Sequence, residues 1–271
     1  MDRNVVMICL PTDTSYARAV LRGATRFACE QPDWSLGVRP LWDLRRGFHR
    51  IEVDGLLIQA MEPWHVEEAL AANGSAVNVA DAFAVKGLPT VISDHRKIGR
   101  AAAEHLLQRG LRHFAYYGNE QSLYSHERRV GFADALTSAG IELEDGWRYD
   151  DANDSVRLPR KGWLKKLPHP VGIMTAHDAL ARGVADGCIS EGLRVPQDVA
   201  IIGVDNDEMA CEVGGIPLST VATDGEGIGY EAARLLGRLM AGQAIEQKLV
   251  LIPPLGVIAR ASTDLHLSAG Q

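Results

Sequence analysis

The sequence predicts an α/β fold with two separate parallel sheets that are covered by helices on both faces. Short apolar runs alternate with helical patterns almost throughout the 271 residues. The run 199–204, VAIIGV, is apolar at nearly every position, as in a strand buried on both faces of a parallel sheet. The alternation restarts after Asp94, which indicates that a second sheet begins there.

The part of the chain before Asp94 begins with a strand followed by an amphipathic helix. Apolar residues of the segment 16–30 recur with the spacing of one helical face, and Thr14 or Ser15 is placed to cap that helix. The elements expected here are strands at 5–10, 35–40, 55–58, near Val77 and at 89–92, and helices at 16–30 and 64–72.

The part after Asp94 repeats the pattern and then changes it near the end. Expected helices lie at 98–108, 128–139, 179–191 and 228–240, and expected strands at 113–117, 171–174, 199–204, 218–222, 249–252 and 256–258. Pro253 and Pro254 separate the last two strands. Since proline cannot donate to a sheet ladder, these residues suit an edge or a crossing segment.

Composition excludes several classes of function. The formal charge of −7 and the pI of about 5.7 provide no general attraction to nucleic acid or anionic lipid. No segment is apolar over a membrane-spanning length, and Asp13 interrupts the position of a signal peptide, so a cytoplasmic protein without a membrane partner is expected. Cys9, Cys29, Cys188 and Cys211 lie far apart, which favours buried reduced thiols and predicts no metal site.

Polar residues follow most of the expected strands. Because ligands of open α/β sheets bind beyond the carboxyl ends of the strands, these residues predict a site for a polar small molecule. Carboxylates accept hydrogen bonds from hydroxyl groups, arginine supplies a planar fork of donors, and an aromatic ring covers a C–H face, so the set suits a polyhydroxylated ligand. The candidate residues are Asp13, Tyr16, Asp94, Arg128, His177, Asp178, Asp205 and Asn206.

Each candidate also has a structural interpretation. Asp13, Asp94 and Asp178 are placed to cap helices. Arg128 could be solvated, His177 could fill a turn, and Asp205 with Asn206 could form a cap or an Asx-turn. Catalysis and cofactor binding have less support, because Gly225, Gly227 and Gly229 match a dinucleotide loop only weakly and no nucleophile or metal motif is present. No cofactor is expected.

Several motifs together resemble the sugar-sensing domain of LacI-type repressors. They are TVISD, S-x-x-R-x-x-G-F at 125–132, MTAHDALARGV, GLRVPQDVAIIGVDN, IPLSTV, IGYEAARLL and LIPPLGVIARAST, in an order that covers 5–263. The resemblance implies the periplasmic-binding-protein type I fold, with two αβα (Rossmann-like) subdomains, three crossovers near Asp94, Thr223 and Ala244, and an effector between the subdomains. It implies subdomains of 1–93 with 225–244 and of 95–222 with 246–263, and a tail at 264–271.

The resemblance also assigns roles to individual residues. Arg128 matches the effector-binding arginine, Asp205 an effector-binding acid, and Asp178 the acid of an Asn-Asp pair in which His177 replaces the asparagine. The aromatic residues Trp34, Trp42, Trp64 and Tyr124 are further candidates for tuning selectivity.

The family begins with a helix-turn-helix, whereas Met1 lies only four residues before the first expected strand of this sequence. This arrangement is similar to xylose-responsive regulators, in which a LacI-like sensor precedes an AraC-type DNA-binding domain. The resemblance therefore implies a sensor fragment that binds a monosaccharide, D-xylose or another pentose, and performs no chemistry. It implies a homodimer that reaches DNA only through a domain outside this chain. The alternatives are a sugar solute-binding protein, which the lack of an export signal disfavours, and an α/β sugar or nucleoside hydrolase.

Overall fold

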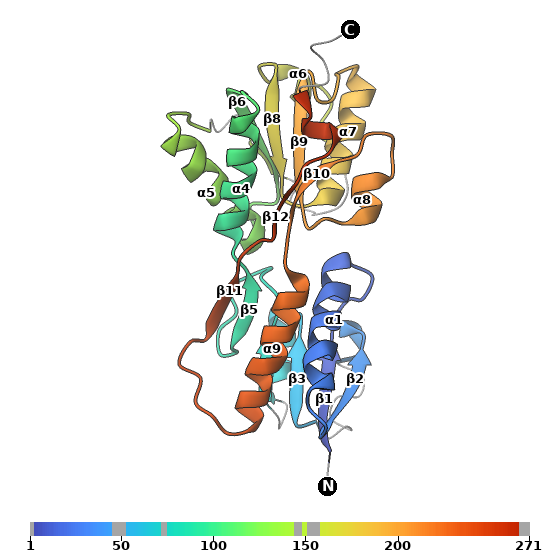
Figure 1. Ribbon diagram of the computed structural model, residues 1–271, viewed down its shortest axis with the longest axis vertical. Helices are drawn as coiled ribbons and strands as arrows, with labels where there is room; N and C mark the ends of the chain where they lie inside the picture. Colours follow the sequence, from blue (N-terminus) through green and yellow to red (C-terminus); the bar gives the residue numbers. More distant parts are fainter. Residues whose placement is uncertain (1–2, 45–52, 72–74, 144–147, 151–157, 266–271) are drawn as a thin grey trace. The chain divides into compact units, whose positions relative to one another are not determined.

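The computed structural model describes residues 3–44, 53–71, 75–143, 148–150 and 158–265 (Figure 1). Residue contacts divide the chain into two units, Met1–Ser93 with Asp224–Ile252 (unit 1) and Asp94–Thr223 with Pro253–Gln271 (unit 2). Each unit contains a six-stranded sheet. The predicted α/β class with two separate sheets is confirmed.

Unit 1 contains a sheet, here called sheet A, in which every described strand pair is parallel. Its order is β11-β5-β4-β3-β1-β2. The strands are β1 (Asn4–Cys9), β2 (Trp34–Arg39), β3 (Gly55–Ile58), β4 (Ser75–Asn78), β5 (Thr90–Ser93) and β11 (Leu249–Ile252), and the helices are α1 (Ser15–Cys29), α3 (Pro63–Ala71), α9 (Gly225–Met240) and the 3-10 turn η1 (Leu41–Asp43).

The two faces of sheet A have separate cores, which explains the continuous apolar runs of its strands. Val6 and Ile8 of β1 belong to the core that includes residues of α1 and α9. Met7 and Cys9, which alternate with them, belong to the core that includes residues of α3 and η1. Since successive side chains of a strand point to opposite faces, a strand covered on both sides must be apolar at every position.

Unit 2 contains sheet B, with the order β12-β10-β9-β8-β6-β7. Its described pairs are parallel except β10 with β12. The strands are β6 (His113–Gly118), β7 (Arg148–Asp150), β8 (Val171–Thr175), β9 (Val199–Val204), β10 (Ser219–Ala222) and β12 (Gly256–Ile258), and the helices are α4 (His95–Gln108), α5 (Leu123–Ser138), α6 (Trp163–Lys166), α7 (Asp178–Glu191), α8 (Glu208–Glu212) and the 3-10 turn η4 (Ala261–Thr263).

In each unit one pair of helices packs backbone against backbone at glycines. A Cβ atom at Gly229 of α9 would overlap the carbonyl oxygen of Val20 in α1, and one at Gly23 of α1 would overlap Glu226. Gly99 of α4 and Gly131 of α5 make the equivalent approach in unit 2. Gly229, which the sequence placed in a weak dinucleotide motif, therefore serves helix packing.

The third crossover differs from the expectation. It was expected near Ala244, but the chain leaves unit 1 after Ile252, because β11 first pairs in parallel with β5. Residues 246–252 therefore belong to unit 1 rather than to the C-terminal subdomain. Pro253 and Pro254 then interrupt the strand, and β12 begins at the edge of sheet B.

Short elements and element ends account for the other differences. The expected helix at 128–139 begins at Leu123, and β7, α6 and α8 were not expected. The expected tail at 264–271 is only partly described, since residues 266–271 lie outside the described residues. Leu265 packs against the core of unit 2, so the tail cannot begin at residue 264.

Two smaller findings concern membranes and thiols. Among the described residues, no helix is both long enough and apolar enough to cross a membrane. All four cysteines are free, and Cys9, Cys188 and Cys211 are buried as expected, whereas Cys29 is exposed.

A buried histidine fastens the segment after β12 to unit 2. His105 Nε2 lies 2.8 Å from the Thr263 hydroxyl group, which lies 2.7 Å from the Ser219 hydroxyl group. Burial first, and then the charge of Arg109, lower the pKa of His105 to about 4. His105 is therefore a neutral residue in the folded protein near pH 6.

Replacing Gly229 with alanine should destabilise the protein by about 3 kcal/mol, because the added methyl group would force α1 and α9 apart. Gly237→Ala is the matched control in the same helix, since the atoms nearest to a Cβ atom there belong to the side chains of Trp34 and Phe27. Its higher helix propensity should leave stability unchanged or raise it by about 0.5–1 kcal/mol. Chemical denaturation measures both. Equal effects of the two variants would contradict the packing role of Gly229.

His105 should make the protein less stable as the pH falls from about 6.5 to about 4. In that range the unfolded chain binds a proton that the folded protein rejects, so the unfolding free energy drops by roughly 2 kcal/mol. His105→Gln should remove this part of the pH dependence, while His169→Gln, at an exposed position, should retain it. Urea unfolding at pH 4.5 and 7 is the measurement. A His105→Gln profile identical to that of the wild type would contradict the expectation.

Candidate functional site

Polar side chains gather at the carboxyl edge of sheet B, the edge at which α/β sheets hold ligands. They come from the start of α4, from α5, and from the segments after β8 and β9. The side chain of Arg260 joins them through Asn206, although Arg260 follows the antiparallel strand β12 and its backbone lies at the start of β10. We call this group the Arg128 cluster; it consists of His95, Tyr124, Arg128, Asp178, Asp205, Asn206 and Arg260.

Arg128 is the central cation of the cluster and is only 5% exposed. Its Nε donates to His95 Nδ1 at 3.2 Å, and its Nη2 lies 3.4 Å from Asp205 Oδ1. Its Nη1 donates to the carbonyl oxygen of Ala176, and the guanidinium lies 5.2 Å from the centre of the Tyr124 ring. The interpretation of Arg128 as a solvated side chain is therefore wrong.

The position of Arg128 follows from the way α5 is held. The Tyr116 hydroxyl group donates to the carbonyl oxygen of Ser125 at 2.8 Å, which fixes the first turns of α5 against β6. The approach of Gly131 to α4 then brings Arg128 next to His95, the first residue of α4. Two uncharged contacts, the Tyr116–Ser125 hydrogen bond and the approach of Gly131 to α4, thus position the guanidinium.

Asp205 and Asn206 have an unusual backbone for residues other than glycine. Their φ angles are 102° and 57°, in the left-handed region. Such conformations cost about 1–3 kcal/mol each and persist where neighbouring groups hold them. The amide of Asp205 donates to Val221 O at 3.0 Å, and the amide of Asn206 donates to the Thr220 hydroxyl group at 3.2 Å. The cap of α8 is Asp207, so neither residue serves as that N-cap.

Asp178 is a buried carboxyl group next to Asp205. Its Oδ2 accepts from the amide of Asp207 at 2.8 Å, and a Cβ atom at Gly203 would overlap its Oδ1. Burial, and then the charge of Asp205, raise the pKa of Asp178 to about 7. Asp178 is only 1% exposed, and its bond to the amide of Asp207 supports the segment that follows β9. Asp178 is not the cap of α7.

Two other candidates in unit 2 have cap roles. His177 is the N-cap of α7 and accepts from the amide of Leu180 at 3.4 Å. Asp94 is the N-cap of α4, where it accepts from the amide of Lys97 at 3.1 Å and pairs with the Lys97 ammonium at 3.0 Å. These contacts position both residues at the carboxyl edge without joining them to Arg128.

Asp13 and Tyr16 belong to unit 1. Asp13 is exposed and Thr14 caps α1, so the interpretation of Asp13 as the cap is wrong. The Tyr16 hydroxyl group donates to the carbonyl oxygen of Val79 at 2.7 Å. Their part in ligand binding stays a prediction.

The structure brings His95, Tyr124 and Arg260 together with the expected residues. The sequence offered Tyr124 only as an aromatic residue that could tune selectivity, and it did not offer His95 or Arg260. His95 directly follows the expected candidate Asp94, and Tyr124 precedes Arg128 by four residues, a spacing that places Tyr124 and Arg128 on one helix face. Arg260 Nη2 donates to Asn206 Oδ1 at 2.8 Å, although the two residues are 54 positions apart. Only the first two carried a local signal in the sequence.

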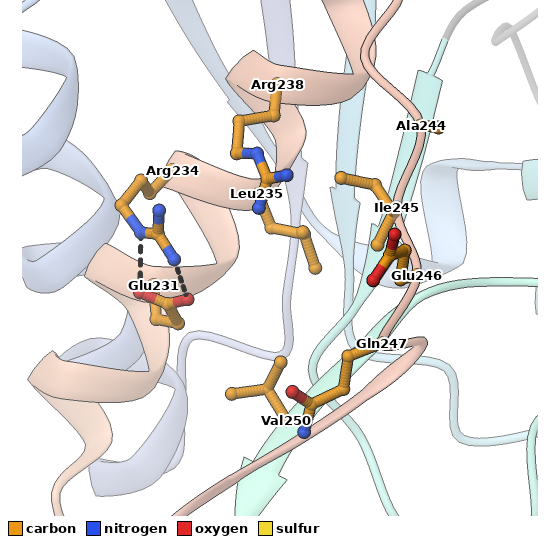
Figure 2. A pocket seen from close by; sticks show the side chains of 9 residues that line it. All are labelled: Glu231, Arg234, Leu235, Arg238, Ala244, Ile245, Glu246, Gln247 and Val250. Carbon is orange, nitrogen blue, oxygen red and sulfur yellow. Dashed lines mark hydrogen bonds and ion pairs between the residues drawn. The ribbon is translucent and has the colours of Figure 1, made fainter.

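A hollow of about 490 Å³ in unit 1 lies elsewhere (Figure 2). Arg234 and Glu231 on its α9 side neutralise each other through a 2.8 Å hydrogen bond, and Gln247 lies across from them. Gln247 precedes β11, so the hollow is at the amino edge of sheet A. Ligands of α/β sheets bind at the opposite edge, so we do not assign the site to this hollow. In the described part of the chain, no group of three or more His, Cys, Asp or Glu side chains could hold a metal ion.

Residues 103–263 match the family model of the periplasmic binding protein-like domain. The chain is 29% identical to the xylose operon regulatory protein of Haemophilus influenzae over 235 residues, which are 80% of this chain and 58% of that protein. It is 26% identical to the protein of the same name from Escherichia coli K12, over 97% of this chain and 70% of that protein. The chain therefore spans less than two thirds of the first relative.

Solved structures of similar fold include transcription regulators. The xylose-binding transcription activator xylR superposes with a TM-score of 0.82 at 23% identity, over 97% of this chain and 70% of that one. A complex of the transcriptional regulator CelR with cellobiose has a TM-score of 0.79 at 22% identity, over 96% of this chain and 85% of that one. At these identities the likeness shows the fold alone, which is the periplasmic-binding-protein fold that the sequence predicted.

Replacing Asp178 with asparagine should make the protein more stable at pH 8 than the wild type, by about 2 kcal/mol. The folded state holds the Asp178 proton more tightly than the unfolded state, so the unfolding free energy of the wild type falls as the pH rises from about 4 to about 7. Asparagine carries no charge and avoids this loss. Asp186→Asn, on the exposed side of the same helix, is the control. Urea unfolding at pH 5 and 8 should separate them, and parallel profiles would argue against a raised pKa.

Proposed function

Because the chain belongs to the family of periplasmic binding protein-like domains, we propose that it is the sugar-binding regulatory domain of a transcription regulator of the LacI type. The observation that carries the proposal is the pairing of the buried Arg128 guanidinium with Asp205 at the carboxyl edge of sheet B. Xylose regulators are among the relatives, and they supply the first candidate ligand, D-xylose.

The chemistry of the Arg128 cluster suits hydroxyl groups. The Asp205 side chain is 22% exposed, so its carboxylate can accept from the hydroxyls of a bound sugar while Arg128 holds it in place. The Tyr124 ring beside the guanidinium offers a face for C–H groups. Hydrogen bonds to charged groups contribute about 1.5–3 kcal/mol each, so a few of them support micromolar binding once the ordering cost is subtracted.

The identity of the sugar depends on differences around this common core. A regulator with a similar fold is bound to cellobiose, so the fold accommodates sugars of different size. His177 occupies the position at which the resemblance places an asparagine, and an imidazole ring offers different donors and acceptors from an amide. We propose that D-xylose or another pentose is the ligand and that His177 contributes to its selection.

Regulation requires that the protein exchange between two conformations that differ in their affinity for sugar. A ligand shifts this conformational equilibrium only by the difference between its affinities for the two conformations. We propose that sugar binding shifts this equilibrium and that DNA contact belongs to a part of the whole protein outside this chain, of the AraC type. We further propose that the unit is a cytoplasmic homodimer without enzymatic activity.

Isothermal titration calorimetry against D-xylose, L-arabinose, D-ribose, D-glucose and D-galactose tests the proposal. We expect one pentose to bind with a dissociation constant in the micromolar range and to raise the melting temperature. Recovery of that sugar unchanged after incubation separates binding from hydrolysis. If no sugar in the panel raises the melting temperature at millimolar concentration, the assignment is wrong.

Replacing Arg128 with lysine should weaken sugar binding more than tenfold, because lysine keeps the charge but lacks the planar fork that reaches Asp205 and the carbonyl of Ala176. Arg100→Ala, at an exposed position of α4, is the matched control and should bind like the wild type. Asp13→Asn tests the prediction for unit 1 in the same assay. Circular dichroism confirms that each variant is folded, and unchanged affinity of Arg128→Lys would remove Arg128 from the site.

A further inference from the structure

Arg260 is the member of the Arg128 cluster that comes from the segment after β12. Its Nη2 donates to Asn206 Oδ1 at 2.8 Å, and its Nη1 donates to the carbonyl oxygen of Leu218 at 2.9 Å. Its backbone amide donates to Ser219 Oγ at 2.8 Å, and Ser219 Oγ lies 3.0 Å from the Arg260 carbonyl oxygen. The side chain of Arg260 thus bridges the segment after β9 and the residue before β10, while its backbone contacts the first residue of β10.

Asn206, which accepts a hydrogen bond from Arg260, has a backbone conformation that neighbouring groups must stabilise. Asn206 has a φ angle of 57°, and Asp205 before it has a φ angle of 102°. Side chains other than glycine rarely adopt these angles unless the surroundings hold them. On the side-chain end of Asn206, the support comes from the guanidinium of Arg260. If Asn206 relaxed, the carboxylate of Asp205 would turn relative to Arg128.

The segment after Arg260 is itself fastened to unit 2 through buried groups. We call residues 260–265 the C-terminal clamp. Thr263 Oγ1 lies 2.8 Å from His105 Nε2 and 2.7 Å from Ser219 Oγ, and its carbonyl oxygen accepts from Arg109 Nε at 2.7 Å. Ser262 Oγ donates to the carbonyl oxygen of Ile201 in β9 at 2.6 Å. A displacement of the clamp would therefore displace Arg260.

We propose that Arg260 is a positioning residue for sugar binding, which holds Asn206 in the left-handed conformation and couples occupancy of the Arg128 cluster to the order of the C-terminal clamp. The inference rests on the proposed function. Coupling between two sites is reciprocal. A sugar that fixes Asp205 therefore stabilises the Asn206–Arg260 bond and the clamp behind it, and a change that loosens the clamp lowers the affinity for sugar.

The first test uses a double-mutant cycle with glycine at position 206. Arg260→Lys should weaken binding of D-xylose, or of the panel sugar that the wild type binds, by about tenfold in calorimetry. Glycine adopts the left-handed conformation without strain, so a protein with Asn206→Gly no longer needs Arg260 for that purpose. In the Asn206→Gly background, Arg260→Lys should therefore change the affinity less than twofold. Equal losses in both backgrounds, or no loss in the wild-type background, would overturn the proposal.

Arg109→Lys is the matched control because Arg109 holds the same clamp but has no contact with Asn206 among the described hydrogen bonds. It should lower the melting temperature as Arg260→Lys does and weaken sugar binding less than Arg260→Lys does. A drop in affinity that simply follows the drop in melting temperature across both variants would assign Arg260 a structural role only and overturn the proposal.

Hydrogen exchange measured by mass spectrometry provides the second readout. Peptides that cover 260–265 should exchange more slowly when the wild type is saturated with sugar, and this protection should disappear in Arg260→Lys at saturating sugar. Unchanged exchange of these peptides in a wild type that binds sugar would overturn the coupling but leave the proposed function intact. A wild type that binds no sugar would overturn both.

Discussion

A permanent positive charge inside unit 2 is the constraint around which its carboxyl edge is built. A guanidinium remains protonated in a protein, so Arg128 at 5% exposure requires hydrogen-bond acceptors and an opposite charge nearby. The acceptors come from separate elements, namely His95 of α4, the carbonyl after β8, and Asp205 after β9. The cluster therefore exists only when sheet B and both helices are assembled.

The same constraint explains two costly features of the site. Asp205 must turn towards Arg128 immediately after a buried strand, which places it and Asn206 in the left-handed region. Asp178 is buried close enough to Asp205 that its pKa rises to about 7. These costs are local, and the Val221 carbonyl and Thr220 hydroxyl groups of β10, together with Arg260, hold the geometry. Strain of this kind concentrates where a protein prepares a binding site.

In both units, glycine residues allow two helices to pack at backbone distance. A parallel sheet buried on both faces needs helices close to one another, and glycines allow α1 to approach α9 and α4 to approach α5 at backbone distance. In unit 2 this approach has a functional consequence, because it aligns Arg128 with His95. Membership in the periplasmic binding protein-like family agrees with this architecture and with the regulators among the relatives.

The sequence alone determined the class of the fold, the succession of strands and helices, and most of the residues at the carboxyl edge, because apolar periodicity and strand ends are local properties. β3, β11 and β12 have the expected ends. Tertiary structure alone decided which candidate cap residues act as caps, that β11 joins sheet A, and that Arg260 reaches Asn206. Strand pairing and contacts across 54 residues depend on how elements pack in space, and no local pattern records that choice.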